Sequence, residues 1–303
     1  MSTLTLSLAG GMTLKLAAEH ASSVLTNYQL AVHLFELYLT KEYDGKRIKV
    51  TKAAPDNSDL NRIKEALIRN GIIHEQDEIG AGVYRYNAHS NFGSEQIICG
   101  VDPFAYISHL SAMVHYGFTD RIPKIIFAST WDQKNWGRAA YDVMEKRLGD
   151  HLELYHQTGL PNLRRINLKS VHRQQVSLYT SGGVGSFVHV RDQGFRVSSI
   201  GRTFLDMLRR PDLCNGINHV LDVFEEHAER HLKLIIDEVS NHGSKIERVR
   251  AGYILEEICG LRHEGINAWI ESAQRGGSRK LDPEGDYVPE FSERWCISLN
   301  VIR

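Results

Sequence analysis

The chain has 303 residues, a length that corresponds to about two domains of ordinary size. Its formal net charge is -1, so any nucleic-acid site must be a local patch and not a property of the whole chain. The four cysteines are far apart and form no C-x-x-C pair, which argues against a zinc site and a disulfide framework. We find neither a basic signal-peptide start nor the roughly 18 apolar residues of a membrane span, and we expect a cytoplasmic protein that does not contact a membrane.

Two amphipathic segments dominate the first part of the chain. Apolar residues at helical spacing predict a helix over 26–43, with Thr26 or Asn27 as its cap. A Gly-marked turn and a short strand follow, and then a loop. A second helix is predicted over 58–70, and Gly71 is placed to end it.

The stretch 72–86 predicts a β-hairpin, since two short strand-like runs flank the turn Gly80-Ala81-Gly82. The order helix, strand, helix, strand, turn, strand is that of a winged helix with one of its usual three helices not obvious. That helix is either the weakly patterned segment 12–22 or a short turn inside 51–57, and the sequence does not decide between them.

A second unit follows a predicted connector over 88–98. We expect a helix capped by Asp102, a buried strand over 122–130, a helix over 133–148 and a strand over 163–171. The remaining expectations are strands on either side of the Gly-rich stretch 181–186, helices over 201–210, 215–240, 244–259 and 263–273, and a last short strand over 295–301.

Helix 58–70 carries a polar face that suits a DNA major groove. Asn and Arg side chains read base edges bidentately, and Arg and Lys neutralise phosphates. Hypothetical base-proximal residues are Ser58, Asn61 and Arg62, with Glu65 on the same face; Lys64, Arg69 and Arg85 would hold phosphates, and Tyr84 would either touch the backbone or pack on the helix. Flanking phosphate contacts are predicted at Lys46, Arg47, Lys49, Lys52, Arg164, Arg165, Lys169, Arg173, Arg275, Arg279 and Lys280. The alternative is a solvated helix face and a plain hairpin.

Other motifs are weaker. The stretch "SGGVGS", 181–186, matches no phosphate-binding pattern and favours a tightly turning connection. Carboxylates such as Glu256, Asp282 and Glu284 leave open a divalent-metal-dependent nuclease, although a Gly/Pro-rich loop is poor scaffolding for a fixed metal. A non-catalytic protein-interaction module is a further alternative. We expect no catalytic residue, no metal and no cofactor.

Three blocks together resemble the AbiEi-type antitoxins of type IV (abortive-infection) toxin–antitoxin systems. They are "DPFAYISHLSAMVHYGFTDRIPKIIFAST", "FRVSSIGRTFLDMLRRPDLCNGINHVLDVFEEH" and "KIERVRAGYILEEICGL", and the hairpin before them stands where that family has its wing. The resemblance runs from about Val24 to the C-terminus.

The resemblance implies a phage-defence regulator whose winged helix binds double-stranded operator DNA and represses its own operon. It also implies an antitoxin that counters a nucleotidyltransferase-like toxin without a stable complex, acting as a monomer or weak homodimer on paired half-sites. We therefore expect an α+β fold. A winged-helix DNA-binding domain would span 1–90, with 1–22 as an extra arm or helix. A larger mixed α/β antitoxin domain ending in a helical region would span 91–303.

Overall fold

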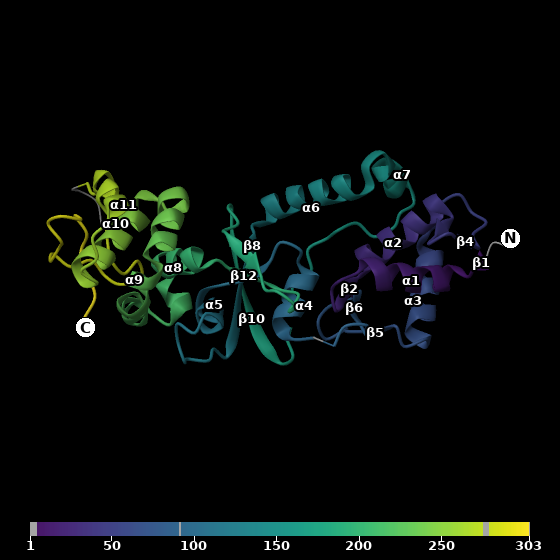
Figure 1. Cartoon of the computed structure of the whole chain (residues 1–303), viewed down its shortest axis with the longest axis horizontal. Coiled ribbons are helices and arrows are strands. Elements are labelled where there is room, and N and C mark those ends of the chain that lie inside the picture. The colour runs from purple at the N-terminus through teal and green to yellow at the C-terminus, as the bar shows by residue number, and fades with distance from the viewer. Residues whose placement is uncertain (1–4, 91, 275–278, 303) are drawn as a thin grey trace.

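The computed structural model describes residues 5–90, 92–274 and 279–302 of the chain. The molecule is elongated, with the N-terminus at one end, a sheet in the middle and a helical region at the C-terminal end (Figure 1). Helices and several separate sheets alternate along the chain, so the expected α+β class is confirmed.

The N-terminal part contains helices that pack on two small sheets. The helices are α1 (Leu8–Glu19), α2 (Asn27–Thr40) and α3 (Asn57–Arg69). One sheet has the strand order β2-β6-β5, from β2 (Val24–Thr26), β5 (Ile73–Glu75) and β6 (Val83–Tyr86). The other has the order β1-β4-β3, from β1 (Thr5–Leu6), β3 (Glu42–Tyr43) and β4 (Lys46–Ile48).

Of the two segments considered for an additional helix, the first is largely covered by α1. Its Met12 and Leu16 are fully buried against α2 and α3. Residues 51–56 form a loop instead. The inserted stretch after α2 forms the β3–β4 hairpin, which β1 extends by parallel pairing with β4.

Local signals set the start of α2 and both ends of α3, whereas α2 ends at Thr40, three residues before the expected end. Thr26 caps α2 in a capping box with Gln29. Asp56 caps α3 and accepts hydrogen bonds from the backbone N–H groups of Ser58 and Asp59. Gly71 follows α3 with a φ of 65°, a left-handed conformation that favours glycine.

The middle of the molecule is a mixed sheet with the strand order β11-β12-β7-β8-β10-β9. Strand β8 (Ile125–Trp131) pairs in parallel with β10 (Gln174–Ser181), and both were expected from the sequence. The other strands are β7 (Tyr106–Ile107), β9 (Ser170–Val171), β11 (Phe187–His189) and β12 (Arg196–Ser198), and the helices of this part are α4 (Ser94–Val101), α5 (His109–His115), α6 (Gln133–Leu148), a 3₁₀ turn (Gly149–His151) and α7 (Leu152–Gln157).

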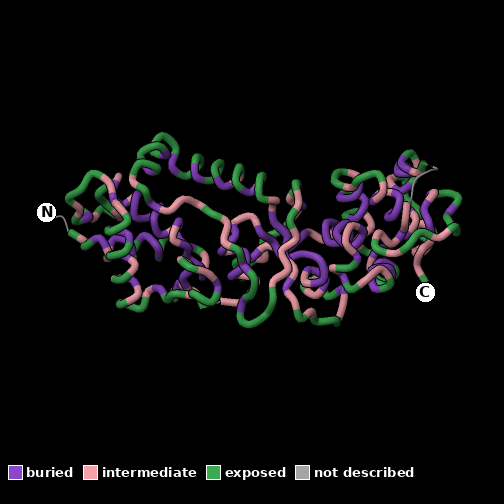
Figure 2. The backbone as a smooth tube through the Cα atoms, turned by 180° about the vertical axis from the view of Figure 1, so that it is seen from behind, coloured by how far each residue is buried: buried purple, intermediate pink, exposed green. Residues whose placement is uncertain are grey.

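Helix α6 joins the middle of the molecule to the N-terminal part. Its buried residues Trp136, Ala140, Met144 and Leu148 recur every four residues, and Figure 2 shows its outer side exposed. Met144 and Leu148 belong to the same hydrophobic cluster as Phe35 of α2. Residues far beyond position 90 thus complete the core of the N-terminal part.

The C-terminal part is helical. Its elements are α8 (Ile200–Arg209), a 3₁₀ turn (Pro211–Cys214), α9 (Ile217–His242), α10 (Lys245–Tyr253), a π-helical turn (Ile254–Ile258), α11 (Glu264–Ala268) and a final 3₁₀ turn (Trp269–Ser272). Its core holds Phe204, Phe224 and the fully buried Trp295.

Four local predictions were wrong. The connector 88–98 contains the start of α4. Asp102 does not cap the next helix, which begins at His109, because its carboxylate accepts hydrogen bonds from Thr130 Oγ1 and Trp136 Nε1.

A strand was expected over 163–171, but the strand observed there, β9, covers just Ser170–Val171. Residues 163–168 pack between helices and the hairpin turn instead. The expected last strand is reduced to isolated bridges of Ser298 with Lys280 and Phe291. Among the described residues, no helix has the length and apolarity that a membrane crossing requires.

Candidate nucleic-acid interface

Helix α3 presents two faces of opposite character. Leu60, Ile63 and Leu67 are at most 2% exposed and join the core formed with α1 and α2. The opposite face exposes the predicted base-proximal residues Ser58, Asn61, Arg62, Glu65 and Arg69, with Lys64 half-buried at its edge. The structure therefore brings these predicted contacts together on one accessible helix face.

A buried carboxylate orients the start of this face. Asp59 is 2% exposed, and its two carboxylate oxygens accept from Arg62 (2.8 Å) and Lys52 (2.9 Å). The Arg62 side chain remains 66% exposed, so part of its guanidinium stays available. Hydrogen bonds to Asp56 and Asp59 raise the pKa of Lys52, whose charge is neutralised locally. Lys52 therefore has little unpaired charge to offer to a phosphate.

The β5–β6 hairpin is acidic at its turn. Glu75, Asp77 and Glu78 are exposed, and Arg85 is the hairpin's basic residue. Arg85 is half-buried, with its guanidinium carbon 5.0 Å from the centre of the Phe92 ring. The hairpin turn repels phosphates, so the basic charge of an interface must come from other segments.

Tyr84 belongs to the core. Its side chain is 3% exposed, and its hydroxyl donates to Asn27 Oδ1 at 3.2 Å. Burial raises the pKa of this phenol to about 12. Of the two roles predicted for Tyr84, packing on the helices is the one observed, and the DNA contact is withdrawn.

Basic flanking residues lie on two segments near α3. Arg47 and Lys49 are exposed on or beside β4, where Lys46 pairs with Asp44 at 3.4 Å. The second is the crossing segment, residues 159–169, which leads from α7 towards β9. At its start, the Gly159 carbonyl accepts from Asn57 Nδ2 at 3.0 Å, and further on Ile166 lies against Gly80 of the hairpin turn.

The crossing segment therefore runs from the N-terminus of α3 to the hairpin. It carries Arg164 and Lys169, which are exposed, and Arg165, which is half-buried. Arg173 follows in the exposed β9–β10 turn.

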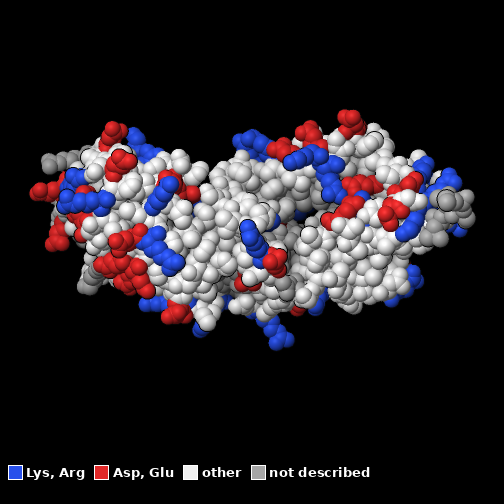
Figure 3. All heavy atoms as spheres, in the orientation of Figure 1, with Lys and Arg blue, Asp and Glu red and all other residues white. Residues whose placement is uncertain are grey.

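The remaining residues predicted as flanking phosphate contacts belong to the C-terminal part of the chain. Arg279 donates to the Ser272 carbonyl, and Lys280 to the Gly285 carbonyl, both in the C-terminal part. That part lies at the opposite end of the molecule from α3 (Figure 1), so these two residues are removed from the interface. Arg275 lies outside the described residues. Figure 3 shows charges of both signs mixed over the two ends of the molecule, with a largely uncharged middle.

Two of the three carboxylates considered for a nuclease, Glu256 and Asp282, are engaged in the C-terminal part. Glu256 Oε2 accepts from Arg294 Nε at 2.6 Å and from Trp295 Nε1 at 3.0 Å. Asp282 Oδ1 accepts from the backbone N–H of Glu284 at 3.0 Å. These bonds give each of Glu256 and Asp282 a structural role.

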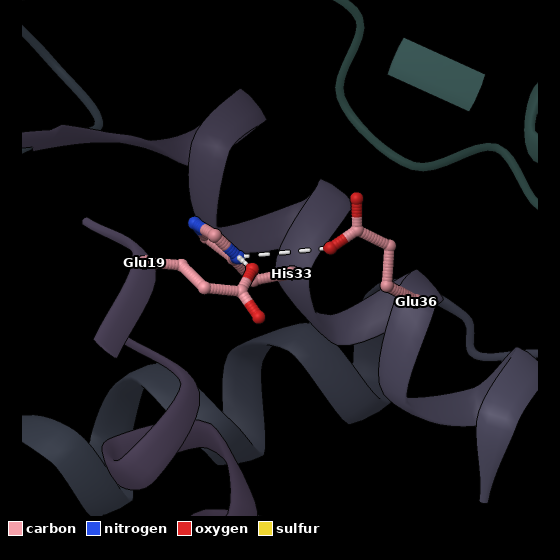
Figure 4. A group of neighbouring side chains, drawn as sticks. All are labelled: Glu19, His33 and Glu36. Atoms are coloured by element: carbon pink, nitrogen blue, oxygen red, sulfur yellow. Dashed lines mark ion pairs between the residues drawn. The ribbon is translucent and has the colours of Figure 1, made fainter. Parts of the chain in front are cut away.

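A charged cluster that the sequence did not indicate joins α1, α2 and α6. Figure 4 shows the His33 imidazole beside the carboxylates of Glu19 and Glu36, with Nδ1 3.8 Å from an oxygen of each. Lys15 Nζ lies 2.8 Å from Glu19 Oε2 and 3.0 Å from Glu36 Oε2. Arg147 of α6 donates through Nε to Glu36 Oε1 at 2.6 Å, which ties α6 to α2.

The ligand atoms of Glu19, His33 and Glu36 lie within 4.8 Å of one another, a spacing that suits a metal ion. However, the Lys15 ammonium already contacts both carboxylates, so its charge takes the place of a divalent cation. Burial lowers the pKa of His33 to about 4. The positive charges of Arg147 and Lys15 lower it as well, whereas the negative charge of Glu36 opposes them by raising it. The cluster is therefore a charge-balanced ion-pair network around a neutral histidine.

Comparisons with known proteins give little beyond the geometry. No family model matches the chain, and no curated protein sequence matches it. A crystal structure of the Rv2827c protein from Mycobacterium tuberculosis is similar over 96% of this chain and 90% of that chain, with a TM-score of 0.44 and 13% sequence identity.

Proposed function

We propose that this chain is a cytoplasmic DNA-binding antitoxin of the AbiEi type, which represses its own operon and counters a nucleotidyltransferase-like toxin without a stable complex. The observation that carries the DNA-binding part is the order α1-β2-α2-β3-β4-α3-β5-β6 with the sheet order β2-β6-β5. Apart from the inserted β3–β4 hairpin, this order is the one expected of a winged helix, and the polar face of α3 is exposed. The antitoxin part rests on the resemblance of the sequence blocks.

In this proposal α3 enters the major groove as the recognition helix. Asn61 and Arg62 read base edges bidentately, and Glu65 accepts from a cytosine amino group. The ion pair of Arg62 with Asp59 restricts its side chain before binding, which lowers the entropic cost of contacting a base.

Phosphates are neutralised by Lys64 and Arg69 on α3 and by the flanking residues on β4 and the crossing segment. The acidic turn of the β5–β6 hairpin supplies no such contact. The wing therefore supports α3 through Tyr84 and the sheet, while the crossing segment supplies basic residues beside the duplex. Two copies meet paired half-sites, either as monomers or as a weak dimer.

The test is fluorescence-anisotropy binding to the duplex upstream of the protein's own gene and to a scrambled duplex, over a salt series. We expect tight binding to the first and weak binding to the second. The slope of log affinity against log salt gives the number of phosphates, at about 0.9 per contact. Equal, weak binding to both duplexes would remove the DNA-binding function.

The double variant Asn61→Ala/Arg62→Ala tests α3 itself. Each bidentate base contact contributes about 1–3 kcal/mol of discrimination, so the double variant should lose operator preference while keeping its far-UV circular dichroism spectrum. The matched control Asn241→Ala/Arg230→Ala removes the same residue types from exposed positions of α9. Unchanged preference in the α3 variant would refute the assignment of the recognition helix.

A further inference from the structure

A cavity of about 670 Å³ lies between the first turns of α6 and the crossing segment. Its volume is within the range of small-molecule sites, about 300–1,000 Å³. In the view of Figure 3 the surface is hollowed beneath α6. The two sides of this cavity differ in chemistry, and the difference indicates a class of ligand.

One side of the cavity is cationic. Arg164 and Arg165 line it, and neither guanidinium has a hydrogen bond or an ion pair with any residue that the structure describes. No acidic residue is among the described residues of the lining, so nothing there offsets the two charges. Adjacent guanidinium groups with free N–H donors match the geometry of a phosphate group. The amide of Asn167 adds a neutral polar group beside them.

The other side is apolar and rigid. It is formed by Trp136, Leu163 and Leu178. The indole N–H of Trp136 donates to Asp102 Oδ1 at 3.0 Å, and its ring meets the Phe104 ring edge-on at 5.4 Å. These contacts fix the indole, which is 3% exposed, so the apolar surface open to a ligand comes mainly from the half-buried Leu163 and Leu178. The surface is in place before a ligand arrives, which avoids an ordering cost on binding.

Gly137 keeps the cavity open. It lies inside α6 and lines the cavity, and a Cβ at this position would meet no atom within 4 Å. No packing contact therefore requires glycine here, although glycine in a helix interior costs about 0.5–1 kcal/mol relative to alanine. Any larger side chain would project into the space between α6 and the crossing segment.

We propose that this cavity binds a nucleotide, with its phosphate on Arg164 and Arg165 and its base against the apolar wall around Trp136. Two free guanidinium groups select the phosphate, and the aliphatic surface of Leu163 and Leu178, backed by the buried Trp136, accommodates the apolar face of a base. The site lies apart from the exposed face of α3, and it shares Arg164 and Arg165 with the flanking phosphate contacts of the proposed function. Nucleotide binding is a property additional to base reading by α3.

The test is isothermal titration calorimetry of the full chain with AMP, GMP, CMP and UMP, and with adenosine and inorganic phosphate as separate probes. At least one nucleotide should bind saturably, and more tightly than adenosine or phosphate alone. Arg164→Gln/Arg165→Gln should weaken that affinity by at least about tenfold, since each charge-assisted hydrogen bond contributes about 1.5–3 kcal/mol. The control Arg138→Gln removes a neighbouring exposed charge of α6 outside the lining and should leave the affinity unchanged.

Gly137→Leu separates this inference from the proposed function. It should abolish nucleotide binding with an intact circular dichroism spectrum and unchanged operator affinity, whereas Asn61→Ala/Arg62→Ala should retain nucleotide binding. Gly137→Gln, which adds a polar side chain of similar length, serves if the leucine variant does not fold. Absence of saturable binding by all four nucleotides, or binding that both the arginine and the Gly137 variants leave intact, would overturn the inference.

Discussion

Two glycines in helices give opposite predictions for the same substitution. Gly252 lies in α10 against the indole of Trp295, and a Cβ there would come closer than 3.0 Å to three ring atoms. Trp295 is fully buried, so its ring cannot move away without disturbing the C-terminal core. Gly137 of α6, in contrast, has no atom within 4 Å of the same position.

The expected magnitudes follow from these surroundings. Replacing glycine by alanine in a helix interior contributes about 0.5–1 kcal/mol of stability at either site. At Gly252 overpacking costs about 1–3 kcal/mol in addition. Gly137→Ala should therefore raise the free energy of unfolding, Gly252→Ala should lower it or leave it close to neutral, and the two variants should differ by about 1–3 kcal/mol.

Urea unfolding followed by far-UV circular dichroism measures this difference, with equal m-values as the condition for comparing the variants. The reasoning is refuted if Gly252→Ala stabilises the protein as much as Gly137→Ala does. That result would mean that the indole of Trp295 does not lie against α10 as described.

Two further predictions concern the N-terminal part. The pKa of His33 is lowered from 6.5 to about 4, so the unfolded chain binds more protons between these values, and stability should fall as the pH falls through this window. In the His33→Gln variant, the free energy of unfolding measured in urea should depend less steeply on pH in this window, by up to about 1.4 kcal/mol per pH unit. A slope equal to that of the unsubstituted chain would exclude a buried neutral His33. Tyr84→Phe removes one hydrogen bond to Asn27 and should cost about 0.5–1.5 kcal/mol of stability without changing operator affinity. A loss of affinity in this folded variant would return Tyr84 to the DNA interface.

Elements with strong local signals could be predicted from the sequence. Helix 133–148 was placed correctly at both ends, because Asp132 caps it, its apolar residues recur every four positions, and Gly149 follows it. The exposed face of α3 was also predicted, since its apolar residues have clear helical spacing. Helix α1 was uncertain because its sequence, "LAGGMTLKLAAE", contains two glycines and a weak polar face.

Tertiary contacts explain what the sequence could not indicate. Asp102 has the local pattern of a helix cap, but hydrogen bonds to Thr130 and Trp136, distant in sequence, determine its role. Residues 163–168 carry apolar side chains at Leu163, Ile166 and Leu168, and these pack on helices and the hairpin turn without forming a strand. The cavity beside Trp136 joins segments about 30 positions apart, and its local signals were an unexplained glycine in a helix and two adjacent arginines.

Helix α6 has a mechanical consequence. A continuous helix of 16 residues is about 24 Å long and nearly incompressible along its axis. Its first turns line the cavity, while Met144 and Leu148 in its last turns are embedded beside Phe35, and Arg147 holds Glu36. A tilt at one end must therefore displace the other end. The helix therefore forms a continuous rigid connection between the cavity and the helices that support α3.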